Sequence, residues 1–369
     1  MMKGFFFNRS GANARPVSSQ RRWSSALPLV ALTVACGGGG DADAGNLAGG
    51  GSPSSTSTST SPSASNVSGP VAGTSGLLAD VASFPKGAVG ATSERVSATA
   101  ERPSASDGTG NFRTTCEYSH MAYDDPIVFP GQPGRSHLHA FFGNTAVTAH
   151  STSESIAQRG NSTCRGGTVN RSAYWVPAMI DTRSRTPVQP QESMFYYKTG
   201  YNGVRPADVR PFPAGLRMIA GDPSNRNPSG HFRYYCYNNP SMRGNSFPNC
   251  PVGDDLVTEI WFPQCWDGVN LDSPDHKSHM AYPRGGCPAS HPVPLPEITF
   301  NIHYRVTQAN QTAHWRMSSD TYDGPPGYSS HGDWWNGWEQ TALEEWVRHC
   351  NNPGLDCHAH LLGNGRQIF

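Results

Sequence analysis

Two histidines separated by a single residue are the first candidates for chemistry in this chain. His137 and His139 follow a Pro-Gly turn. In an extended segment, residues two apart point to the same side, so both imidazoles can face one site. Such a pair is a common start of a zinc, copper or manganese site. A hydrogen-bonded pair beside Phe141 and Phe142 is the alternative.

A second group of polar residues fills the loop of residues 265–279. It holds three aspartates, two histidines and a lysine, and proline and glycine interrupt it. The aspartates are suitable oxygen ligands for calcium, although their spacing is not that of an EF-hand. Asp275, His276 and His279 are suitable ligands for a transition metal instead. A solvated loop of Asx turns is the competing interpretation.

The third group combines one histidine, one aspartate and three tryptophans. His331 and Asp333 lie two residues apart, and Trp334, Trp335 and Trp338 follow them. Tryptophans this close to glycine and asparagine suggest an exposed platform that stacks on sugar rings. Burial of the same tryptophans in the core is the alternative.

A fourth candidate pairs a tyrosine with a lysine. Tyr196 and Lys198 share one face of an expected strand, because residues two apart in a strand point the same way. Together with a histidine from elsewhere they could bind an acidic sugar and abstract a proton from it. An ordinary strand surface has the same composition, so this pair is the weaker candidate.

These groups must be positioned by a mainly β domain. The clearest strand is 298–306, in which apolar and polar side chains alternate. Further expected strands are 172–180, 193–199, 232–237 and 256–262, which are rich in aromatic and β-branched residues. One helix is expected at 339–349. Helices do not alternate with the strands, so we expect an antiparallel sandwich or jelly-roll-like fold with long loops.

Cysteine usage indicates an exported, disulfide-braced domain. An even set of eight cysteines remains when Cys36 is set aside, and such a set in an exported protein indicates disulfides. We expect pairing between neighbours in sequence, most securely Cys350 with Cys357 and Cys236 with Cys250. No C-x-x-C motif supports a zinc–thiolate site. The eight are Cys116, Cys164, Cys236, Cys250, Cys265, Cys287, Cys350 and Cys357.

The amino-terminal third has the composition of an export signal followed by a tether. Residues 1–35 carry five basic residues, no acidic residue and a short apolar run, which indicates a signal peptide. Cys36 follows Val34-Ala35, as in a lipobox, so we expect a lipidated cysteine that anchors the chain to a membrane. Residues 36–109 are expected to be a tether rich in glycine, serine, threonine and proline. One globular domain is expected over 110–369.

The charge balance argues against nucleic acid as a partner. The whole chain has 28 basic and 28 acidic residues. Removal of the basic signal leaves a small net negative charge, and no basic cluster remains to follow a phosphate backbone. We therefore expect a protein that faces the periplasm or the cell exterior and that binds no nucleic acid.

Four runs of the domain together resemble a secreted family of unknown function, DUF1996. They are residues 125–144, which include Ser136-His137-Leu138-His139, and residues 171–178, 262–279 and 331–333. The resemblance covers about 116–350. Where the family usually carries an acidic or polar residue, this chain has Ala140. In fungi the domain is often joined to WSC modules, which implies an extracellular, polysaccharide-related setting but supplies no catalytic residue.

The favoured hypothesis is an enzyme that hydrolyses or eliminates an extracellular polysaccharide. One divalent metal ion (zinc, copper, manganese or calcium) would be held by His137, His139, His276 and His279. Trp334, Trp335, Trp338, Tyr196 and Lys198 would bind the glycan. The residues expected to take part in catalysis are His137, His139, Asp275, His276, His331 and Asp333.

Two alternatives belong to other classes of function. A glycan-binding surface module would need the tryptophans but not the histidines. A metal scavenger would need the histidines but no turnover. A serine hydrolase is disfavoured, because the G-x-S-x-G motif of the nucleophile elbow is absent.

Overall fold

The computed structural model describes residues 79, 81, 84 and 86–369. The predicted signal peptide, the lipidated Cys36 and most of the predicted tether lie outside the described residues. Within the described part of the chain, no helix has the length and apolar character needed to cross a bilayer.

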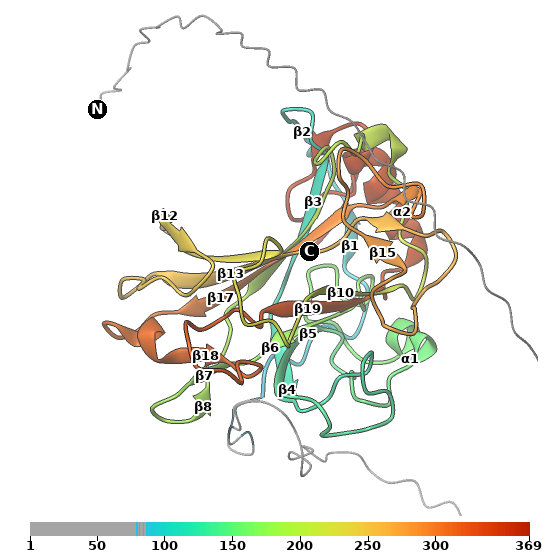
Figure 1. Ribbon diagram of the computed structural model, residues 1–369. Helices are drawn as coiled ribbons and strands as arrows, with labels where there is room; N and C mark the ends of the chain where they lie inside the picture. The colour runs from blue at the N-terminus through green and yellow to red at the C-terminus, as the bar shows by residue number, and fades with distance from the viewer. Residues whose placement is uncertain (1–78, 80, 82–83, 85) are drawn as a thin grey trace, which may run out of the picture. The chain divides into compact units, whose positions relative to one another are not determined.

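A five-stranded antiparallel sheet carries two of the predicted groups. Its second and fourth strands begin at His331 and His139. Both strands lie next to the same central strand, so residues far apart in sequence become neighbours (Figure 1). In spatial order the strands are β10 (Arg217–Gly221), β19 (His331–Trp335), β6 (Ala173–Pro177), β5 (His139–Gly143) and β4 (Tyr118–Ala122).

An eight-stranded sheet forms the second layer. Its strands pair antiparallel except at the single parallel contact between β20 and β3. In spatial order they are β12 (Asn239–Gly244), β11 (Phe232–Cys236), β13 (Asp255–Trp261), β17 (Glu297–Arg305), β9 (Ser193–Lys198), β3 (Asn111–Cys116), β20 (Leu355–Asp356) and β2 (Ser104–Ala105).

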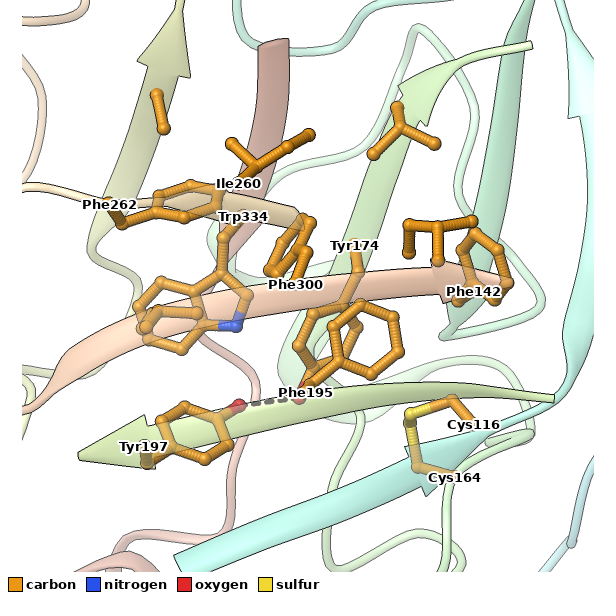
Figure 2. Packing of buried hydrophobic residues seen from close by; sticks show 14 of the residues in the cluster. Cys116, Phe142, Cys164, Tyr174, Phe195, Tyr197, Ile260, Phe262, Phe300 and Trp334 are labelled. Carbon is orange, nitrogen blue, oxygen red and sulfur yellow. Dashed lines mark hydrogen bonds between the residues drawn. A yellow bond between two sulfur atoms is a disulfide. The ribbon is translucent and has the colours of Figure 1, made fainter. Parts of the chain in front are cut away.

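The two sheets pack face to face over an aromatic core. Tyr174 and Phe142 of the smaller sheet contact Phe195 of the larger one, with ring centroids 4.2 and 5.7 Å apart. Figure 2 shows the hydroxyl groups of Tyr174 and Tyr197 joined by a hydrogen bond of 2.6 Å across this core. Hydrogen bonding between buried hydroxyls offsets their loss of hydration. The predicted antiparallel, sandwich-like architecture is confirmed.

The predicted elements agree with the observed ones within a few residues. The five expected strands correspond to β6 and β7 (Met179–Asp181), then β9, β11, β13 and β17. The expected helix is α2 (Gln340–Trp346), and a π-helical turn (Val347–Asn351) extends it. Further elements include α1 (Ser153–Gln158), β8 (Thr186–Pro187), β14 (Cys265–Trp266), β15 (Met280–Ala281), β16 (Val293–Pro294), β18 (Trp315–Met317) and the short 3-10 turns Pro206–Asp208 and Gln311–His314.

Four disulfides join cysteines that are neighbours in sequence, which confirms the predicted pairing. They are typical of proteins in an oxidising, extracytoplasmic compartment. Cys265–Cys287 closes the loop that contains the second polar group. The other bridges are Cys116–Cys164, Cys236–Cys250 and Cys350–Cys357.

The folded unit begins before the expected boundary at Gly110. Strand β1 (Val96–Ala98) pairs with the carboxy-terminal strand β21 (Arg366–Ile368). Gly87 donates its backbone N–H to the Ser119 carbonyl. Residues 86–109 are therefore part of the folded domain rather than of the tether. Composition suggested a tether because these short strands carry few apolar residues of their own.

Candidate metal centre

Three of the predicted histidines meet in space. One ring nitrogen from each of His137, His139 and His331 lies within 4.8 Å of the other two. Their side chains are 7, 0 and 3% exposed, so the group is almost completely buried. Within the described residues this is the one group of metal-ligating side chains that converges so closely.

Strand register explains why His139 and His331 meet. His139 on β5 pairs with Pro177 of β6. On the other side of β6, Asp333 of β19 pairs with Trp175, and the same register continued by two residues places His331 opposite Pro177. Backbones two strands apart are about 10 Å from each other. Two imidazoles that lean inward over the middle strand span this gap. The same antiparallel pairing that builds the sheet therefore brings the two rings together.

Backbone hydrogen bonds fix the tautomer of two of the three rings. The Nδ1 atom of His139 lies 2.9 Å from the Asp124 carbonyl, and that of His331 lies 2.8 Å from the Ser329 carbonyl. A carbonyl only accepts hydrogen bonds, so Nδ1 carries the proton in both rings. Each Nε2 atom is then left with a lone pair, and the two Nε2 atoms lie 3.4 Å apart.

The third ring is held in the same tautomer by a serine. Ser318 donates its hydroxyl proton to the Leu138 carbonyl at 2.5 Å. The same hydroxyl oxygen lies 3.1 Å from Nδ1 of His137, and it must accept there because its proton is already used. His137 therefore also presents an unprotonated Nε2. Hydrogen bonding at the far nitrogen is the usual support of a metal-binding histidine.

The imidazoles stay neutral at neutral pH. Burial, together with the neighbouring His139, lowers the pKa of His331 to about 3. Burial likewise lowers the pKa of His137 and His139 well below the ordinary value. Two neutral rings whose lone pairs face each other at 3.4 Å repel, unless a cation lies between them.

The distance between the Nε2 atoms of His139 and His331 suits a tetrahedral metal ion. Two nitrogens bound about 2.0–2.1 Å from zinc in tetrahedral geometry lie about 3.3 Å from each other. Adjacent nitrogens of a square-planar copper site lie closer, about 2.8 Å apart. The observed 3.4 Å between His139 and His331 matches the tetrahedral value.

Two buried carboxylates hold the backbone that positions the histidines. Asp124 accepts from the Gly134 and Ala149 backbone N–H groups at 2.9 and 3.0 Å. Asp320 accepts from the Ser329 hydroxyl at 2.6 Å and so fixes the segment that leads into His331. Sequence reasoning did not single out these residues or Ser318. Asp124 directly precedes the 125–144 run and could have been included with it. Asp320 and Ser318 belong to no motif that is recognisable in the sequence.

Asp333 lies on the same face of β19 as His331 and is fully buried. Its Oδ2 atom has no hydrogen-bond partner among the described residues. Burial raises its pKa, and the nearby Asp125 carboxylate raises it further, whereas Lys277 lowers it. Burial also raises the pKa of Asp125 to about 6. Asp333, two residues from His331 on the same strand face, therefore carries a carboxyl group that ionises reluctantly.

The predicted histidines of the 265–279 loop lie outside the three-histidine group. Both ring nitrogens of His279 are engaged, Nδ1 with the Ser273 hydroxyl at 2.9 Å and Nε2 with the Arg217 carbonyl at 2.7 Å. His276 is bonded through Nδ1 to Asp272 at 2.9 Å. Both rings therefore have hydrogen-bond partners within the protein. The candidate metal-binding group contains His331 instead of His276 and His279.

Asp275 organises its own loop. It accepts hydrogen bonds from the backbone N–H and hydroxyl of Ser278 at 2.9 and 2.8 Å and from the Ser273 hydroxyl at 2.7 Å. These bonds, chiefly that of the Ser278 backbone, lower the pKa of Asp275. A carboxylate stabilised in this way is a weak base. The Asx-turn interpretation describes this residue better than the catalytic one.

The three tryptophans do not form the expected surface platform. Trp334, Trp335 and Trp338 are 0, 1 and 5% exposed. Trp334 packs on Phe212, and Trp338 donates its indole N–H to the Tyr197 hydroxyl at 3.0 Å. The prediction of an exposed aromatic surface at these residues was wrong, because Trp334 and Trp335 lie on β19, an interior strand covered on both faces, and Trp338 packs in the core.

Tyr196 and Lys198 lie on the outer face of the eight-stranded sheet. Their neighbour Tyr197 points the opposite way, into the core between the sheets. Lys198 pairs with Glu297 at 3.3 Å, and its ammonium lies 5.8 Å from the centre of the Tyr196 ring. The structure therefore does not bring this pair to the three-histidine group, which lies on the other sheet.

The comparisons with known proteins identify the family. Residues 125–338 match a family model described as a domain of unknown function, DUF1996. The matched region contains the three histidines, Asp125 and Asp333. Searches of curated proteins and of solved structures found no match. The family model covers more than half of the chain and includes every residue of the candidate metal centre; the chain belongs to the DUF1996 family.

Proposed function

We propose that this domain binds one divalent transition metal ion, best fitted by zinc, at His137, His139 and His331. We further propose that it uses this centre to hydrolyse or eliminate an extracellular polysaccharide. The observation that carries the proposal is the shared tautomer. Each Nδ1 donates to a carbonyl or a serine oxygen, so each Nε2 keeps its lone pair, and one ring nitrogen of each residue lies within 4.8 Å of the other two.

The ligand set is the one that catalytic zinc sites use. Three protein nitrogens leave one coordination position open, whereas structural zinc sites close all four. A metal held in this way would act as a Lewis acid and lower the pKa of a bound water. Asp333, which lies on the same strand face as His331, is a candidate to accept or hold a proton there.

The setting of the protein supports an extracellular substrate. The four disulfides are characteristic of an oxidising compartment.

We also propose that a lipid on Cys36 anchors the chain to a membrane, and this part of the proposal has its own test. Cys36→Ser should release the chain from the membrane fraction and remove the lipid mass, and an unchanged partition would contradict it.

Elemental analysis of the purified full chain, without an affinity tag, tests the metal centre. We expect about one zinc per chain, lost in His139→Ala and kept in His150→Ala, which removes an exposed histidine outside the group. Absence of metal from a chain refolded oxidatively with added zinc would contradict the proposal. Release of reducing ends or of unsaturated products from polysaccharides, lost in His139→Ala, tests the catalytic part.

Metal binding without turnover is the second candidate function. It is favoured by the burial of the group, since none of the three ligands is more than 7% exposed. Stoichiometric metal together with no turnover on any polysaccharide would support storage or scavenging and reject the catalytic part of the proposal.

A further inference from the structure

A cavity with both apolar and polar lining residues lies one strand away from the candidate metal centre. Its volume is about 350 Å³, and Gly221 and Lys277 form part of its wall. Gly221 on β10 pairs directly with His331 on β19. Paired residues of neighbouring strands have Cα atoms about 5 Å apart, so the cavity wall and a metal ligand are adjacent.

Gly221 allows the two strands to approach closely at this point. Its φ of +81° is one that side-chain-bearing residues rarely adopt, and a Cβ atom there would lie 2.8 Å from the His331 Cα. The Lys277 ammonium donates to the Gly221 carbonyl at 2.9 Å. One backbone position therefore links the lysine, the cavity and the metal ligand.

An aromatic pair forms another wall of the cavity. The rings of His231 and Tyr282 are stacked, with centroids 3.9 Å apart and planes inclined by 17°. The Tyr282 hydroxyl donates to the Trp261 carbonyl at 2.9 Å, which fixes the orientation of its ring. A fixed aromatic side chain beside polar groups is suited to a ligand that is apolar on one face and hydroxylated at its rim.

The cavity also offers a donor and an acceptor of hydrogen bonds. Lys277 has no carboxylate within ion-pair distance among the described residues and uses one carbonyl as acceptor, so ammonium protons remain for a ligand. Asp222 uses its Oδ1 atom for the Ser224 backbone and hydroxyl, and its Oδ2 atom remains as an acceptor. One positive and one negative group favour a neutral polyol over an anion.

We propose that this cavity is a sugar subsite that holds one neutral pyranose ring of a polysaccharide beside the metal centre. Tyr282 packs against the ring, while Lys277 and Asp222 bind its hydroxyl groups. A volume near the lower end of the range of about 300–1,000 Å³ for ligand pockets suits a single ring. The assignment rests on the proposed function, because it takes the sugar as part of the substrate.

Titration of the full chain with neutral hexasaccharides (cellohexaose, mannohexaose and xylohexaose) and with a hexagalacturonate tests this subsite. We expect a neutral hexasaccharide to bind, with Kd raised about tenfold by Lys277→Gln, by Asp222→Asn and by Tyr282→Ala. Tyr282→Phe keeps the ring and should keep binding, which separates loss of contact from loss of folding. Lys86→Gln and Tyr237→Ala, at exposed positions elsewhere, should leave Kd unchanged.

The experiment distinguishes an absent sugar subsite from an absent metal centre. Binding that persists in metal-free His139→Ala supports the subsite even where no metal is found in the parent chain. Binding of the hexagalacturonate alone, or of none of the four probes, overturns it. Equal affinity in the parent chain and in Tyr282→Ala, with the variant folded by circular dichroism, overturns it as well.

Discussion

The Nε2 atoms of His139 and His331 lie 3.4 Å apart, although 192 residues separate them in sequence. Strand β6 lies between the two strands that carry them, and both rings reach over it. Each ring donates from Nδ1 to a main-chain carbonyl, so the pair is oriented by the backbone itself. Two of the three candidate ligands are thus placed by the sheet, and His137 lies in the segment that leads directly into β5.

Removal of the Ser318 hydroxyl should weaken metal binding without removing a ligand. Ser318 accepts from His137 Nδ1 and thereby selects the tautomer with a free Nε2. We expect Ser318→Ala to lower zinc affinity about 10–100-fold. A competition titration against a chromophoric chelator measures this. Ser193→Ala, a buried serine of β9, is the control, and equal affinities of the two variants would contradict the assigned role.

Acid should destabilise the protein partly through His120. This ring stacks on Phe141 and bonds to Ser119 and the Val147 carbonyl, and burial lowers its pKa to about 4. Between pH 6.5 and 4 the unfolded state holds a proton that the folded state lacks, so stability falls as the pH falls. This contribution is complete above pH 6.5, and at most about 3 kcal/mol is lost by pH 4.

The comparison of His120→Gln with the parent chain isolates this effect. Urea unfolding at several pH values should show a slope smaller by up to about 1.4 kcal/mol per pH unit in the variant. Asp125, whose pKa is raised to about 6, acts in the opposite direction between pH 3.8 and 6. It is present in both proteins and cancels in the difference. Parallel pH profiles would show that His120 is not protected from protonation.

Truncation of the Trp334 side chain should lower the free energy of unfolding. The side chain is fully buried and packs on Phe212, with centroids 4.8 Å apart, and near Tyr197. We expect Trp334→Ala to cost about 3–5 kcal/mol in the free energy of unfolding. Tyr237→Ala, at a 55% exposed aromatic, should stay within about 0.5 kcal/mol of the parent. A stable variant that loses only glycan retention would restore the surface-platform hypothesis.

The disulfide that closes the longer loop should contribute more to stability, by an amount that grows with the logarithm of loop length. Cys116–Cys164 spans 48 residues and Cys350–Cys357 spans 7. Chain entropy predicts losses of about 4 and about 2 kcal/mol when each pair is replaced by alanines. Chemical denaturation of the two double variants gives this comparison directly. The reverse order would indicate that native-state contacts, rather than loop closure, dominate.

Local patterns in the sequence predicted most of the fold. The alternation in 298–306 and the aromatic segments at 193–199 and 232–237 identified strands, since side-chain period is a local property. The disulfide pairing followed from sequence proximity. What composition missed was the attachment of residues 86–109, because β1 and β2 gain their stability from pairing with strands at the other end of the chain.

The candidate site was predictable in its parts but not in its assembly. The His-x-His spacing identified His137 and His139, whereas their convergence with His331 depends on strand order. His276 and His279 looked equivalent in sequence, but both nitrogens of His279 and Nδ1 of His276 are bonded within the 265–279 loop or to β10, and neither ring belongs to the converging group. The difference between a ligand and a structural histidine lies in the partner of its second nitrogen, which sequence does not show.

Strand β19 is an interior strand whose flanking strands lie earlier in the sequence. The centre therefore cannot exist on a nascent chain until residue 331 has emerged and β19 has inserted between β10 and β6. An ion that required all three nitrogens would be taken up only after this insertion, in the same compartment in which the disulfides form. The metal content of a preparation would then measure the fraction of chains that have folded completely. A truncated or misfolded chain would hold no ion.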